Sequence, residues 1–149
     1  MAPRDVRNID YYVVDPEPMP SSIPSVPEVG ATSSPLISAS YYIGDRCRAY
    51  NDDFMLCRSQ SRVGPVDCLK EGRRVTRCAI SVLEDINKHC AGEFESHWSC
   101  LDFHQNKMER CRVPEMYLSK CVKKFLNLEK VIPDAEGIPV HERHMPGKV

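Results

Sequence analysis

The sequence has no long apolar run, little aromatic surface and almost no net charge. No stretch approaches the roughly 18 consecutive apolar residues of a membrane-spanning helix. The 149 residues include four Phe and one Trp, so a large enzyme core is not expected. The formal charge of -1 lacks the excess of positive charge that is typical of proteins that bind nucleic acid. The length therefore suggests one small domain or two very small ones, in a protein that is soluble or peripheral to a membrane.

Proline-rich segments flank the centre of the chain on both sides. Residues 1–40 contain seven prolines and many serines, and they lack the 3.6-residue apolar rhythm of a helix. We therefore expect an extended N-terminal arm, with acidic residues and prolines that match neither a transit peptide nor a secretory signal. Residues 129–149 carry Pro133, Pro139 and Pro146 and predict a second, irregular arm.

Cysteine, unlike the aromatic residues, is abundant, and all eight cysteines lie between the two proline-rich segments. On a helix, cysteines ten positions apart are about 15 Å apart along the axis and about 80° apart in azimuth, so they share a seam without touching. A disulfide needs Cβ atoms about 4 Å apart, so each thiol must find its partner on another helix. The repeated C-x9-C pairs are Cys47 with Cys57, Cys68 with Cys78, Cys90 with Cys100, and Cys111 with Cys121.

A turn signal between Cys57 and Cys68 predicts an antiparallel helical hairpin. Val63-Gly64-Pro65 supplies the turn, and a short connection favours antiparallel neighbours. The two cysteines nearest the turn then meet beside it, and the two farthest from the turn meet at the open end of the hairpin. The same argument applies to the last four cysteines of the chain. Of the many connectivities that eight cysteines allow, one is favoured. The predicted disulfides are Cys47–Cys78, Cys57–Cys68, Cys90–Cys121 and Cys100–Cys111.

The positions of apolar residues and of helix-breaking residues predict where the helices begin and end. Ala91-Gly92 is expected to end the second helix, and the fourth helix is expected to begin near Cys111, because Pro114 is tolerated in a first turn. Phe94 and Trp98 are expected in a core between the hairpins. The prediction is an all-α fold of two tandem disulfide-stapled antiparallel helical hairpins, at 41–89 and 90–128, between extended arms at 1–40 and 129–149.

The alternative is that the cysteines are ordinary buried thiols of a helical core. Random placement would rarely give four identical spacings beside a turn signal. Hairpins of about 35 residues bury too little apolar surface to be stable alone. A disulfide that closes a loop of about 15 residues contributes on the order of 3 kcal/mol in the chain-entropy model. Cross-linked hairpins in an oxidising compartment are therefore favoured.

Twin C-x9-C hairpins resemble the coiled-coil-helix–coiled-coil-helix (CHCH) proteins of the mitochondrial intermembrane space. Two modules in tandem are similar to the double-CHCH accessory subunits of mitochondrial NADH:ubiquinone oxidoreductase, complex I. The resemblance covers about residues 37 to 125. The segments that carry it are Asp53-Phe54-Met55-Leu56-Cys57-Arg58, Cys68-Leu69-Lys70-Glu71-Gly72-Arg73, Thr76-Arg77-Cys78-Ala79 and His97-Trp98-Ser99-Cys100-Leu101-Asp102.

This resemblance implies a protein that binds rather than catalyses, with no cofactor, no metal and no small-molecule substrate. It implies a subunit peripheral to the mitochondrial inner membrane on the intermembrane-space side, whose partners are neighbouring subunits of the complex I membrane arm. An alternative is a soluble intermembrane-space assembly or metal-handling factor. Copper-transferring relatives carry adjacent cysteines and thiol oxidoreductases carry closely spaced pairs, and this sequence has neither.

Other residues suggest partner contacts. Tyr11-Tyr12-Val13-Val14 lies in an arm without a core of its own and is the predicted partner-binding segment. Two basic helix patches are either solvated faces or contacts for acidic loops and anionic lipid headgroups. His89, His97 and His104 are interpreted as surface or satisfied core histidines, and His141 and His144 as solvated ones. The basic patches are Arg73, Arg74 and Arg77, and Lys120, Lys123 and Lys124.

Overall fold

The computed structural model describes residues 18–61 and 66–132, and within these ranges every regular element is a helix. The expected all-α class is therefore confirmed. Two short 3-10 turns, η2 (Val66–Cys68) and η3 (Met108–Arg110), precede the third and fourth helices. The main helices are α1 (Ser33–Arg46), α2 (Arg48–Gln60), α3 (Leu69–Phe103) and α4 (Arg112–Leu126).

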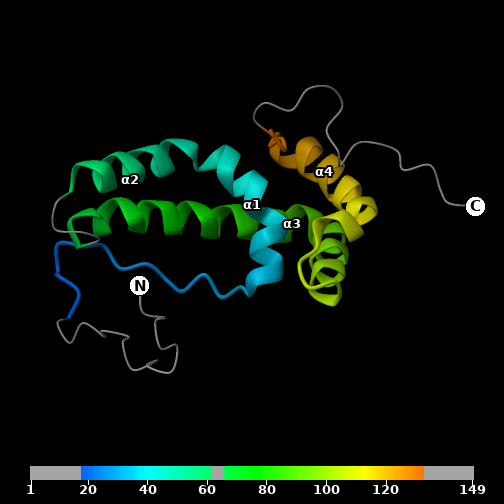
Figure 1. Cartoon of the computed structure of the whole chain (residues 1–149), viewed down its shortest axis with the longest axis horizontal. Coiled ribbons are helices and arrows are strands. Elements are labelled where there is room, and N and C mark those ends of the chain that lie inside the picture. Colours follow the sequence, from blue (N-terminus) through cyan, green and yellow to red (C-terminus); the bar gives the residue numbers. More distant parts are fainter. Residues whose placement is uncertain (1–17, 62–65, 133–149) are drawn as a thin grey trace, which may run out of the picture.

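The first hairpin consists of α2 and the first half of α3, which run side by side in opposite directions (Figure 1). Cys47 separates α1 from α2, because its backbone (φ -95°, ψ 11°) departs from helical geometry. At this point the chain changes direction, so that α1 crosses α3 while α2 follows it. The second half of α3 packs against α4 and forms the second hairpin.

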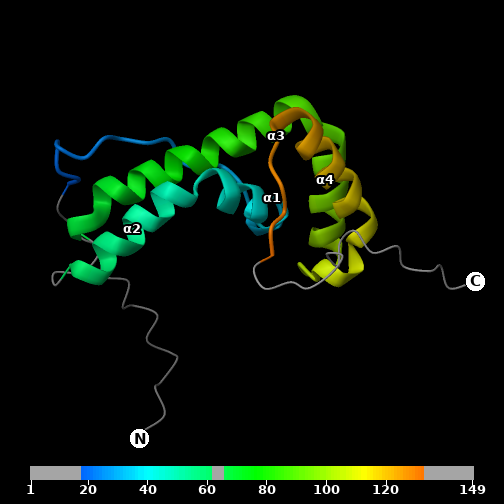
Figure 2. The same cartoon turned by 90° about the horizontal axis from the view of Figure 1, so that it is seen from above.

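α3 spans 35 residues and serves both hairpins, as two helical halves joined across a kink at Cys90. The expectation that the second helix ends at Ala91-Gly92 was nearly right, because helical geometry breaks at the preceding residue, Cys90, and the next helix follows without a loop. Cys90 has non-helical dihedrals (φ -136°, ψ 33°), and Figure 2 shows α3 turning at this level. A single Gly costs a helix only about 1 kcal/mol, and Ile86 and Phe94 on either side are both buried in the same core.

The N-terminal arm becomes helical earlier than expected. Residues 33–40 were expected to be extended, and this prediction was wrong, since they form the first turns of α1. Pro35 lies in the first turn, where its missing N–H would have no intrahelical partner in any case. Ser34, Ser38 and Ala39 are buried, so packing against the rest of the molecule stabilises a segment whose composition favours irregular chain.

The fourth helix begins where the sequence predicts, directly after Cys111. Pro114 lies in its first turn, and the N–H of Glu115 donates the first helical hydrogen bond, to the carbonyl of Cys111 at 3.1 Å. Asn127 ends the helix in a left-handed conformation (φ 52°), which Asn tolerates better than most residues. The chain that follows therefore turns back across the molecule.

The hydrophobic core fills the inside of the bend. Figure 2 shows α1 and the orange segment after α4 lying within the angle that α3 makes. Trp98 is half-buried against this core. The buried members of the cluster are Ala39, Tyr42, Cys47, Cys78, Val82, Leu83, Ile86, Cys90, Phe94, Leu118, Val122 and Leu128.

Candidate functional site: the joint between the two hairpins

The covalent framework holds each hairpin at two levels. All eight cysteines are paired, and the Cα atoms of the pairs lie 5.9 to 6.0 Å apart. Each hairpin has one disulfide between residues 31 apart and one between residues 11 apart. This is the nested arrangement that antiparallel hairpins require. The disulfides are Cys47–Cys78, Cys57–Cys68, Cys90–Cys121 and Cys100–Cys111.

Side chains of α1 bind both arms of the second hairpin. The Ser34 hydroxyl lies 2.8 Å from Oδ1 of Asn106 and 3.2 Å from Oδ1 of Asp102, beside the end of α3. The hydroxyl of Tyr42 shares a hydrogen bond of 2.9 Å with Ser119 of α4. Because these contacts link residues about 70 positions apart, α1 fixes the second hairpin relative to the first.

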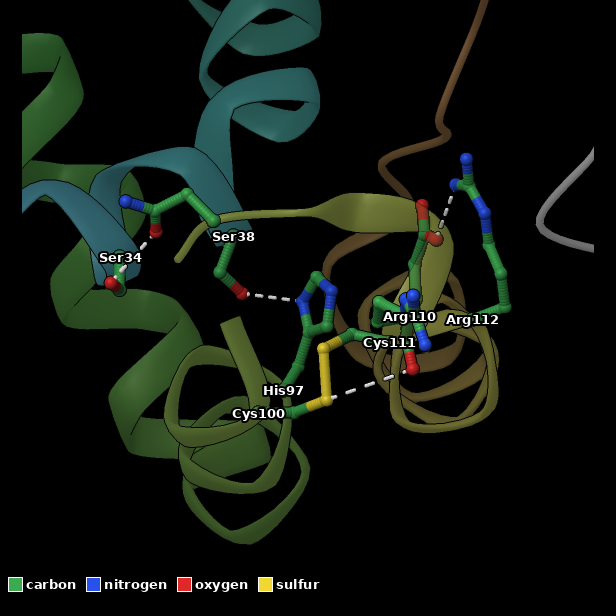
Figure 3. Close-up of a disulfide and its surroundings, with 9 residues drawn as sticks. Ser34, Ser38, His97, Cys100, Arg110, Cys111 and Arg112 are labelled. Atoms are coloured by element: carbon green, nitrogen blue, oxygen red, sulfur yellow. Dashed lines mark hydrogen bonds and ion pairs between the residues drawn. A yellow bond between two sulfur atoms is a disulfide. The ribbon is translucent and has the colours of Figure 1, made fainter. Parts of the chain in front are cut away.

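His97 lies at the centre of this joint. Its side chain is 1% exposed, and Nδ1 lies 2.7 Å from the Ser38 hydroxyl (Figure 3). Nε2 has no hydrogen-bond partner among the described residues. Burial lowers the pKa of His97 to about 4. The charge of Glu115 opposes this shift, and the charges of Lys130 and Arg112 add to it. The imidazole is therefore neutral at physiological pH.

A buried ion pair connects α4 to the chain that follows it. Glu115 is 2% exposed and binds Nη1 of Arg112 at 2.7 Å and the ammonium group of Lys130. Burial alone raises the pKa of Glu115, but hydrogen bonds and charges from Lys130 and Arg112 lower it below its usual value. Burial also raises the pKa of Tyr42, to about 12. Glu115 is therefore a carboxylate with two cationic partners.

Residues 127–130 form a segment that we call the latch. Leu128 is buried in the core, and the ammonium group of Lys130 lies 4.0 Å from the centre of the Tyr41 ring on α1. The N–H of Glu129 donates to Oδ2 of Asp45 at 3.2 Å. The latch thus joins α4 to α1 through one apolar contact, one cation–π contact and one hydrogen bond from its backbone. Together with the polar contacts of α1, it sets the angle between the hairpins.

The arrangement at the joint suits packing rather than turnover. Ser38 and His97 resemble a nucleophile with its base, but they are 3% and 1% exposed, so a substrate has no access to them. Among residues 18–61 and 66–132, no group of three or more His, Cys, Asp or Glu could hold a metal ion. In the same ranges, no helix is both long enough and apolar enough to span a bilayer.

The structure places the other predicted residues in different settings. Tyr11-Tyr12-Val13-Val14, His141 and His144 lie outside the described residues. The members of each predicted basic patch have different surroundings. Arg74 and Arg77 line one groove, whereas Arg73 lines another. Lys123 pairs with Glu129 at 2.9 Å, and Lys124 lies 5.0 Å from the centre of the Phe125 ring.

Sequence reasoning missed most of the joint. Ser34, Ser38 and Tyr42 recur at intervals of four, which is the spacing of one helix face, but serines beside a proline suggested irregular chain. Lys130 lies in a segment with no periodicity at all. Glu115 had one local signal, because Arg112 precedes it by three positions on a helix.

The fold and disulfides define a double CHCH protein, with two C-x9-C hairpins joined through the kinked helix α3. No family model matches the chain. The chain is 51% identical over 146 residues to the NADH-ubiquinone oxidoreductase 20.8 kDa subunit of Neurospora crassa, across 96% of this chain and 80% of that protein. The chain belongs to the family of these NADH-ubiquinone oxidoreductase subunits.

Two plant proteins extend the relationship. The NADH dehydrogenase [ubiquinone] 1 alpha subcomplex subunit 8-A of Arabidopsis thaliana is 35% identical over 81 residues, which are 54% of this chain and 74% of that protein. Subunit 8-B of the same plant is 33% identical over 81 residues, 54% of this chain and 76% of that protein. The shorter alignments with the plant proteins show that part of this chain lies beyond the shared region.

Proposed function

We propose that the chain is a non-catalytic accessory subunit of mitochondrial NADH:ubiquinone oxidoreductase that stabilises its membrane arm and helps to assemble it. The observation that carries this proposal is the 51% identity over nearly the whole chain to a named subunit of that enzyme. The double hairpin supports it, since every cysteine is committed to a disulfide and the titratable centre is buried. The chain contributes a rigid shape rather than a reaction.

We further propose that the subunit lies on the intermembrane-space face of the inner membrane. Four disulfides are stable in an oxidising compartment and rare in reducing ones. Cross-linked helices also lose little conformational entropy when they dock. These properties suit a peripheral subunit that clamps its neighbours.

Exposed apolar side chains support docking against other subunits. On the second hairpin, Phe103 is 82% exposed, and Val113 and Tyr117 share one face of α4 at a spacing of four. On the first hairpin, Met55 and Leu56 are 64% and 57% exposed. Large apolar groups of this kind are typical of surfaces that partners cover.

The experiment that tests the proposal is native electrophoresis of detergent-solubilised mitochondrial membranes. We expect the chain to migrate with the intact NADH-oxidising complex, and we expect less of that complex when the chain is absent. A chain recovered entirely as a free monomer would instead support the soluble assembly or metal-handling factor. Protease treatment of mitochondria with a ruptured outer membrane tests the side, because an intermembrane-space subunit becomes accessible while matrix proteins stay protected.

The predicted anchor Tyr11-Tyr12-Val13-Val14 has a test of its own. We propose that this segment binds a groove on a neighbouring subunit, because extended segments with aromatic residues bind through a few anchors. The variant Tyr11→Ala with Tyr12→Ala should keep the helical content and disulfides of the wild type but enter the complex less efficiently. Equal incorporation of both chains would show that the segment is dispensable.

A further inference from the structure

An open groove lies between α2 and α3 on the first hairpin, away from the joint. Its volume is about 420 Å³. It begins near the point where α1 meets α2 and follows the seam beside the Cys47–Cys78 disulfide. The residues that line it are Arg46, Tyr50, Arg74, Arg77, Cys78 and Ser81.

The groove concentrates positive charge on a chain whose formal charge is -1. Three of its lining residues are arginines, and none is acidic. Arg46 is oriented by Asp85, whose Oδ2 lies 2.6 Å from its Nη1. Arg74 and Arg77 are exposed, and neither has an ion pair or a side-chain hydrogen bond among residues 18–61 and 66–132.

Two other cations of the predicted basic patches have different surroundings. Arg73 lines the groove on the opposite side of the hairpin, against Phe54, Gly72 and Val75. Lys123 already has Glu129 as a partner. Arg74 and Arg77 are about one turn apart on α3, and no residue in the described part of the chain forms an ion pair with either, so they are suited to an external anion.

Guanidinium groups bind phosphate well, because their planar N–H donors match its oxygens two at a time. Tyr50, which is 44% exposed, adds a ring with a polar tip at the edge of the groove. Tyrosine is enriched at the level of lipid headgroups, where one end of the side chain is apolar and the other is hydrated.

We propose that this groove binds the phosphate group of an anionic phospholipid at the membrane surface. The inference rests on the proposed function, which places the subunit beside the inner membrane. An open site with solvent-screened charges holds a free ion weakly. A membrane presents many phosphates at once, and each basic residue near an anionic surface strengthens binding about fivefold.

The test uses the isolated full-length chain with its disulfides intact. Sedimentation with vesicles measures binding to phosphatidylcholine alone and to phosphatidylcholine that contains phosphatidylglycerol. The variant Arg74→Gln with Arg77→Gln should bind the anionic vesicles roughly 25-fold more weakly than the wild type. Both side chains are exposed, so the variant should fold normally. Circular dichroism and thiol titration check this.

The matched control is Arg58→Gln with Arg73→Gln, which removes the same charge from the same hairpin but outside the groove. The control should bind anionic vesicles about as well as the wild type. An equal loss in both double variants would show diffuse attraction and overturn the proposal. Absence of binding to anionic vesicles by the wild type would overturn it as well.

Inorganic phosphate distinguishes a lipid headgroup from a free anion. We expect calorimetric titration with phosphate to give much weaker binding than the vesicles do. Tight binding of phosphate by the wild type, lost in the groove variant, would overturn the assignment to a lipid. Native electrophoresis keeps the proposed function separate, because a chain that binds no vesicles but migrates with the complex would refute only the groove.

Discussion

The two hairpins share the same disulfide spacings, 31 and 11 residues, yet they differ in how much of each is buried. α2 contains no buried residue, whereas α4 buries Glu115, Leu118 and Val122. The core lies around the bend of α3, far from the end of the first hairpin. The two hairpins therefore share one cysteine pattern but are stabilised in different ways. Covalent links hold the tip of the first hairpin, and packing against α1 and the latch holds the second.

A pair of apolar truncations should give the largest difference between the hairpins. Leu118→Ala removes a fully buried side chain and should lower the free energy of unfolding by about 2 to 5 kcal/mol. Met55→Ala changes a side chain that is 64% exposed on α2, and its effect should stay within about 0.5 kcal/mol. Chemical denaturation of the oxidised proteins measures both. Similar losses would show that α2 is packed as tightly as α4.

Removal of the disulfide at each tip sharpens the comparison. In the chain-entropy model, each of these small loops is worth about 3 kcal/mol. Cys57→Ser with Cys68→Ser should also abolish amide protection along α2, because nothing on that helix is buried. Cys100→Ser with Cys111→Ser should leave much of α4 protected through Leu118 and Val122. Hydrogen exchange on the two variants checks this, and the reverse pattern would contradict the comparison.

The joint should also make stability depend on pH. His97 has its pKa lowered from 6.5 to about 4, so the unfolded chain binds a proton there more readily than the folded chain. The contribution of His97 to the free energy of unfolding is fully present above pH 6.5. It is lost as the pH decreases towards 4, by on the order of 3 kcal/mol. Glu115, whose pKa is lowered from 4.5, adds a further loss as the pH falls below that value.

The control for this dependence is His97→Asn, which keeps a polar group near Ser38 but does not titrate. Urea unfolding across the acidic range should show a smaller slope between pH 6.5 and 4 in the variant than in the wild type. Identical slopes would mean that other groups cause the acid sensitivity and that the joint contributes none of it.

The smallest predicted effect concerns the latch. Lys130→Met removes the ammonium group that binds Glu115 and lies over Tyr41, but Arg112 remains as a partner of the carboxylate. We expect a loss of about 1.5 kcal/mol in unfolding free energy. The exposed Lys124→Met should have almost no effect. If the two substitutions cost the same, the latch does not secure the second hairpin.

The spacing of the cysteines was sufficient to predict the hairpins and their order. Four C-x9-C pairs and one turn signal leave little geometric freedom, and Pro114 limits where α4 can begin. Helix α1 could not be predicted in the same way. Its stability comes from Ser34, Ser38 and Tyr42 fitting a surface that forms only after α3 bends and α4 packs against it. Local composition therefore favoured irregular chain.

The joint and the angle of the bend escaped prediction for the same physical reason. Ala91-Gly92 indicates a helix break, which the structure has at Cys90, but it does not indicate how the two helical halves are angled. Ile86 and Phe94, on either side of the kink, are buried in one core. Lys130 binds Glu115 across 15 positions of chain, with a turn at Asn127 that no periodicity indicates. Contacts between segments distant in sequence decided each of these features.

The most direct test of a disulfide-stapled subunit is non-reducing peptide mapping of the chain recovered from the native band of the complex. The account predicts four linked peptide pairs, Cys47 with Cys78, Cys57 with Cys68, Cys90 with Cys121, and Cys100 with Cys111. Free thiols at these positions, different pairs, or absence of the chain from the band would contradict it.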